Sequence, residues 1–80
     1  MEHSSGNEAI IKVYKEVILI NNQILITNNG ILVKNNELLI LNKDCMSLKT
    51  EILLQNNEIL LQNNGIIERN NEMMLKALEY

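Results

Sequence analysis

The sequence predicts an all-α protein, a long heptad-repeat helix that assembles into a homo-oligomeric coiled coil. Three observations lead to this fold class. Pairs of adjacent asparagines recur every seven residues, starting at residues 21, 28 and 35 and again at 56, 63 and 70. Apolar residues keep the same frame, and the 80 residues include no proline. An apolar seven-residue repeat without helix breakers is typical of helices that pack on other helices.

Residues 1–9 precede the repeat and are predicted to form a flexible N-terminal segment. They contain neither a basic start nor an apolar core, so they do not resemble a secretory signal peptide. Ser5 and Glu8 match the Ser-x-x-Glu capping box, which predicts a helix start near Gly6. His3, the only histidine, is expected to be a solvated side chain in this segment.

Residues 10–80 form the heptad-repeat region, whose frame is numbered here from Val17 as position one. Positions one and two hold apolar residues in every heptad from residue 17 to residue 74. Positions five and six carry the asparagine pairs, and position seven carries mainly acidic residues. The second half of the region resembles the first at an offset of five heptads, so we interpret it as a tandem duplication of 10–44 and 45–79. Drift within low-complexity sequence is the alternative explanation.

The oligomer interface is predicted where position one, taken as heptad position a, is followed by an apolar position four, taken as d. This holds near the start of the repeat and again around its middle. The predicted interface residues are Ile10, Val13, Val17, Ile20, Ile24, Leu38, Leu41, Cys45, Leu48 and Ile52. Elsewhere position four is polar, so the asparagine-rich segments must pack in another way.

Three architectures fit this frame. One continuous helix from Ile10 to Glu79 would be about 105 Å long at ~1.5 Å per residue, but it spreads its apolar rows about 100° apart. Pairing positions two and five sets leucine beside asparagine, which looks unfavourable for a seam. A hairpin near Asn42-Lys43-Asp44 would instead let the two halves pack on each other. The third architecture is a β-solenoid or cross-β assembly with asparagine ladders and Asn-Gly turns, although three successive apolar positions conflict with the period-two alternation of strands.

No residue set predicts catalysis, a cofactor or a metal site, so a non-enzymatic structural or oligomerisation protein is expected. Cys45 has no histidine nearby in sequence and is expected to be a small buried hydrophobe. The position-seven acids are expected to form a solvated face. The net charge of −3 comes without a basic block, so a nucleic-acid partner is not expected. No apolar run approaches the ~20 residues of a transmembrane helix, and a cytoplasmic location is the expectation.

The step Leu-x-x-Asn, as in Leu25/Asn28 and Leu60/Asn63, resembles the asparagine-containing cores of trimeric autotransporter stalks. The apolar heptads rich in Asn and Gln are also similar to the first heptad repeat of class I viral fusion proteins. Both resemblances cover only the repeat, and a second asparagine stands where the stalks usually have threonine. They leave a trimer open as the oligomeric state and imply no functional residues.

Overall fold

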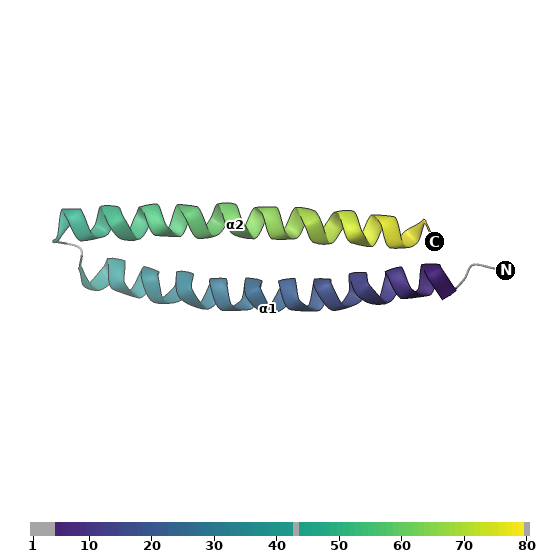
Figure 1. Cartoon of the computed structure of the whole chain (residues 1–80). Helices are drawn as coiled ribbons and strands as arrows, with labels where there is room; N and C mark the ends of the chain where they lie inside the picture. Colours follow the sequence, from purple (N-terminus) through teal and green to yellow (C-terminus); the bar gives the residue numbers. More distant parts are fainter. Residues whose placement is uncertain (1–4, 43, 80) are drawn as a thin grey trace.

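The computed structural model describes residues 5–42 and 44–79, which form two α-helices, α1 (Ser5–Leu41) and α2 (Met46–Leu78). The helices lie side by side and antiparallel, with their connection at one end and both termini at the other (Figure 1). The all-α prediction is therefore confirmed. The described residues contain no strand, and this disfavours the β-solenoid and cross-β alternative.

The prediction of one continuous helix is wrong, because the chain reverses direction between Leu41 and Met46. The hairpin alternative is the arrangement observed, and the reversal falls at the polar run that suggested it; Lys43 itself lies outside the described residues. The molecule measures 65 × 15 × 12 Å between Cα atoms, in place of a rod of about 105 Å. Each helix holds one of the two similar halves of the repeat.

Asn42 ends α1 through its own hydrogen bonds. Its backbone N–H and its side-chain Nδ2 both donate to the carbonyl oxygen of Leu38, each at 2.9 Å. The N–H of Cys45 then donates to the carbonyl of Asn42 at 3.0 Å and closes the turn. Asparagine favours such local bonds to the backbone over continued helix. A short polar run thus reverses the chain without glycine or proline.

The N-terminus of α1 lies one residue from the predicted start. Glu8 occupies the first turn, where a carboxylate interacts favourably with the positive end of the helix dipole. The predicted cap itself cannot be followed further, because the side chain of Ser5 and all of residues 1–4, including His3, lie outside the described part of the chain.

The two helices contact each other along one seam, and each contributes a different pair of heptad positions. From α1 the seam residues fall at positions two and five; from α2 they fall at positions one and five. Val17 at position one and Gly65 at position seven are half-buried outside these rows. In α1 and directly after it, the buried or half-buried residues of the seam rows are Asn7, Ile11, Tyr14, Ile18, Asn21, Leu25, Asn28, Leu32, Asn35, Leu39 and Asn42. In α2 they are Lys49, Ile52, Asn56, Ile59, Asn63, Ile66, Asn70, Met73 and Ala77. The combination of leucine with asparagine, which looked unfavourable in the sequence, is therefore the one that α1 uses.

Candidate interaction site

Asparagines from α1 and α2 meet inside the seam as amide pairs. The Nδ2 group of Asn28 donates to Oδ1 of Asn63, and that of Asn35 donates to Oδ1 of Asn56, both at 2.8 Å. A third pair joins Nδ2 of Asn21 to Oδ1 of Asn70 at 2.8 Å. Five asparagines are buried, with exposed fractions of 5–8%. This row of pairs is called the asparagine ladder below.

Neighbouring amides complete the ladder from both sides. The side-chain oxygens of Gln62 and Gln55 accept second hydrogen bonds from Asn28 and Asn35, at 3.1 and 2.9 Å. On the α2 side of the ladder, Nδ2 of Asn56 donates to Oδ1 of Asn36 at 3.5 Å. An amide left unpaired in a buried place costs about 1–3 kcal/mol. None of the buried side-chain polar atoms described here lacks a partner, so the buried polar groups carry no such cost.

The ladder pair nearest the chain termini, Asn21 with Asn70, has different neighbours from the other two pairs. There Nδ2 of Asn70 donates to Oδ1 of Asn22 at 3.2 Å. The residue before Asn70 is Arg69, where the other two layers have glutamine. The ladder therefore has one layer of four amides, around Asn35 and Asn56, and two layers of three, of which the terminal one lacks a glutamine.

A single register of the hairpin aligns all the ladder pairs. In each pair the two residue numbers add up to 91, as expected for two antiparallel helices without a shift between pairs. Position-five residues recur every seven residues in both helices. Once one pair is aligned, the position-five row of α1 therefore faces the position-five row of α2 along the seam. The same rule sets aliphatic residues between the amide layers, with Leu25 opposite Ile66 and Leu32 opposite Ile59. A slip by one residue would separate every amide pair at once.

The ladder also explains why the two similar halves differ at position four. In α2 this position holds Gln55 and Gln62, and both contact the ladder. The equivalent residues of α1, Ile20 and Thr27, are exposed. Because α1 turns position two into the seam and α2 turns position one, position four lies next to the ladder only in α2.

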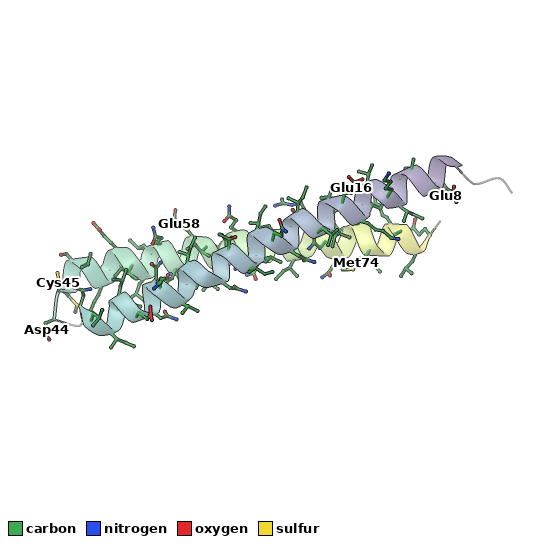
Figure 2. All side chains as sticks on the ribbon, turned by 90° about the horizontal axis from the view of Figure 1, so that it is seen from below. Glu8, Glu16, Asp44, Cys45, Glu58 and Met74 are labelled. Atoms are coloured by element: carbon green, nitrogen blue, oxygen red, sulfur yellow. The ribbon has the colours of Figure 1, made fainter. Side chains whose placement is uncertain are left out.

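Outside the seam, both helices expose large apolar side chains. In the described chain only Ile52 and Ile66 are buried hydrophobic residues, at 7% and 5% exposed. By contrast, 21 large apolar residues are exposed, spread over both helices. Figure 2 shows side chains projecting outward along the full length of the pair. The hairpin therefore covers one narrow seam and leaves most of its aliphatic surface open.

The residues predicted from the sequence to form the oligomer interface lie almost entirely outside this seam. Ile52 is buried within it and Val17 is half-buried. The other eight are exposed: Ile10, Val13, Ile20, Ile24, Leu38, Leu41, Cys45 and Leu48. Their role in contacts between copies stays a prediction. What the sequence analysis missed is the position-five row as an internal seam, and its signal was the seven-residue spacing of the asparagine pairs in both halves of the repeat.

Cys45 is exposed at the turn and not buried as expected. It precedes α2 as its N-cap residue, and its Sγ lies 3.9 Å from Oγ of Ser47. Asp44 lies beside it at the turn end of the hairpin (Figure 2). Among the described residues, no cluster of His, Cys, Asp and Glu could hold a metal ion. Within the same residues, neither helix is apolar enough over a sufficient length to cross a membrane.

Comparison of the chain with protein-family models, with curated proteins and with solved structures finds no match.

Proposed function

We propose that the chain is a non-enzymatic structural protein whose helical hairpins self-associate into a homo-oligomer. The observation that carries the proposal is the open aliphatic surface of a hairpin that buries so few of its apolar residues. Removing apolar surface from water contributes roughly 25 cal/mol per Å². Monomeric proteins rarely expose continuous apolar patches above a few hundred Å². Association of hairpins into a helix bundle would cover this surface.

The charges of the chain support a protein partner of the same kind. Acidic and basic residues are interspersed without a basic block, as in Lys34 and Glu37, which form an exposed ion pair at 3.7 Å. Such a pair contributes little to stability because water screens it. A nucleic acid or an anionic membrane would favour a concentrated basic face. Aliphatic rows with amides between them fit a second helical hairpin better.

Sedimentation equilibrium tests the proposal. Over concentrations from about 1 to about 100 μM, we expect a mass that is a multiple of the 9.2 kDa chain. The multiple gives the oligomer number, including the trimer that the sequence leaves open. A single 9.2 kDa species with a cooperative, concentration-independent unfolding transition would contradict self-association.

A further inference from the structure

The hydrogen bonds of the ladder distinguish two broad sides of the hairpin. Gln55 and Gln62 of α2 reach the ladder asparagines of α1 from one side, defined here as the glutamine side. Asn22 and Asn36 of α1 reach the ladder asparagines of α2 from the other, defined as the asparagine side. Helical spacing then assigns the remaining rows to a side, because residues three or four apart share a face.

On the asparagine side, α1 presents the row at position three. Leu19 and Ile26 lie three residues before and four residues after Asn22, so they flank it on the same face. Val33 continues this row beside Asn36. These three side chains are 65%, 70% and 60% exposed. They are among the most open aliphatic residues of the molecule.

The α2 contribution to the asparagine side is the row at position two. Leu53 and Leu60 flank the ladder residue Asn56 by the same three-and-four spacing, on the margin away from the glutamines. Both are about half exposed. In Figure 2, Met74 of this row lies toward the lower margin of the pair, whereas Glu58 projects to the upper margin.

The two sides differ in charge. Between residues 19 and 40, and between 53 and 67, the asparagine-side rows contain only aliphatic residues and asparagines. Lys34 and Arg69 stand at position four on the glutamine side, and Glu58 stands at its margin. Val33 and Lys34 show the contrast within two adjacent residues. A charge is thus present on one side and absent from the other over about three heptads.

We propose that the asparagine side is the surface on which a second copy of this chain docks, side to identical side about a two-fold axis. The inference rests on the self-association proposed above. A two-fold interface requires a surface that complements itself. An amide both donates and accepts, so the exposed rows of position-six asparagines can pair with the same rows of a second copy. A charged row would face its own charge instead.

One broad side of the hairpin is comparable in size with a typical interface. The molecule measures 65 × 15 Å between Cα atoms in its two longest dimensions, on the order of 1,000 Å², against about 800 Å² per partner in typical stable complexes. The uncharged rows extend over about three heptads, ~32 Å at ~1.5 Å per residue, and so form roughly half of that side. The product is a four-helix bundle in which the ladder lies inside each hairpin and a second set of amides lies between hairpins. Within one hairpin, the position-six residues that bond to the ladder are Asn22 and Asn36. In the bundle, the other position-six asparagines would also form hydrogen bonds, to the second hairpin.

Adjacent residues on opposite sides give a matched test by sedimentation equilibrium. Leu19→Glu introduces a carboxylate on the asparagine side, and Ile20→Glu introduces the same group one residue later on the glutamine side. The two side chains are 65% and 58% exposed, so neither change disturbs the internal seam. We expect Leu19→Glu to weaken association at least about hundredfold, since a buried unpaired charge is costly. For Ile20→Glu we expect a change within about threefold.

Labelling of single cysteines in a Cys45→Ser background reports which side is covered in the oligomer. It does so without a variant designed to break the interface. Asn29→Cys lies on the asparagine side and Thr27→Cys on the glutamine side, and both native residues are exposed. Maleimide labelling of Asn29→Cys should slow as protein concentration rises, while labelling of Thr27→Cys should not.

The possible failures are distinguishable. If Ile20→Glu dissociates the oligomer and Leu19→Glu does not, the proposed self-association stands and the assignment to the asparagine side is overturned. If the unmodified chain is monomeric throughout, both proposals fail. Binding to neutral phosphatidylcholine vesicles that Leu19→Glu abolishes, with no dimer formed, would assign this side to lipid instead of a second copy.

Discussion

Replacing one member of a ladder pair should destabilise the hairpin, whereas replacing both should not. Asn63→Leu removes the acceptor at 2.8 Å from Nδ2 of Asn28 and leaves that buried amide with Gln62 alone, at 3.1 Å. Leaving a buried amide poorly satisfied costs about 1–3 kcal/mol. Leucine has the better helix propensity by about 0.5 kcal/mol. The expected net loss is therefore about 0.5–2.5 kcal/mol.

The double variant Asn28→Leu/Asn63→Leu replaces both amides with aliphatic groups. Such a replacement is nearly neutral or stabilising, because no buried amide remains unpaired and the exposed Gln62 can bond to water in place of Asn28. The two substitutions should thus be strongly coupled, with the double variant at least as stable as the unmodified chain. An additive loss in the double variant would refute the pairing of Asn28 with Asn63.

Thermal unfolding followed by circular dichroism at a fixed chain concentration measures these effects. For a domain of this size, 1 kcal/mol corresponds to about 4–8 °C in Tm. Gln23→Leu is the control, because Gln23 is an exposed amide at position seven that belongs neither to the ladder nor to the asparagine side. We expect a lower Tm for Asn63→Leu and no loss for Gln23→Leu. Equal Tm values for these two variants would show that the position-five asparagines are not buried in pairs.

Three further predictions concern the seam and the assembly. Ile66→Ala should cost about 2–4 kcal/mol in urea unfolding because Ile66 is 5% exposed, whereas Leu61→Ala, at 71% exposed, should cost less than about 0.5 kcal/mol. Gln62→Leu should lower Tm by removing the side-chain oxygen that accepts a 3.1 Å hydrogen bond from Asn28, whereas Thr27→Leu, the equivalent change in α1, should not lower it. Identical melting curves for the two variants would show that this hydrogen bond does not stabilise the hairpin. The Tm of the unmodified chain should rise with concentration, as self-association stabilises the folded state by mass action, and a constant Tm over a hundredfold dilution would contradict it.

The helical fold was predictable from the sequence because its causes are local. A strict heptad, the absence of proline and the Ser5/Glu8 pattern favour helix residue by residue. The polar run at Asn42 and Asp44 marked the place where the chain could turn, and a hairpin there was one of the alternatives. Local signals could not choose between a turn and a continuous helix, since the same heptad frame runs through both halves without a shift.

The seam was decided only by tertiary structure. Position one followed by an apolar position four, as in Val17 and Ile20, suggested a seam by the rule that apolar residues are buried. That rule treats asparagine as a cost, which is correct for one helix taken alone. Once α1 and α2 face each other, Asn28 meets Asn63 and Asn35 meets Asn56, and each amide satisfies its partner. Whether a buried polar group is tolerated depends on what lies opposite it. The sequence therefore determined the period and marked where the chain could turn, while the pairing of the two helices determined which face is inside.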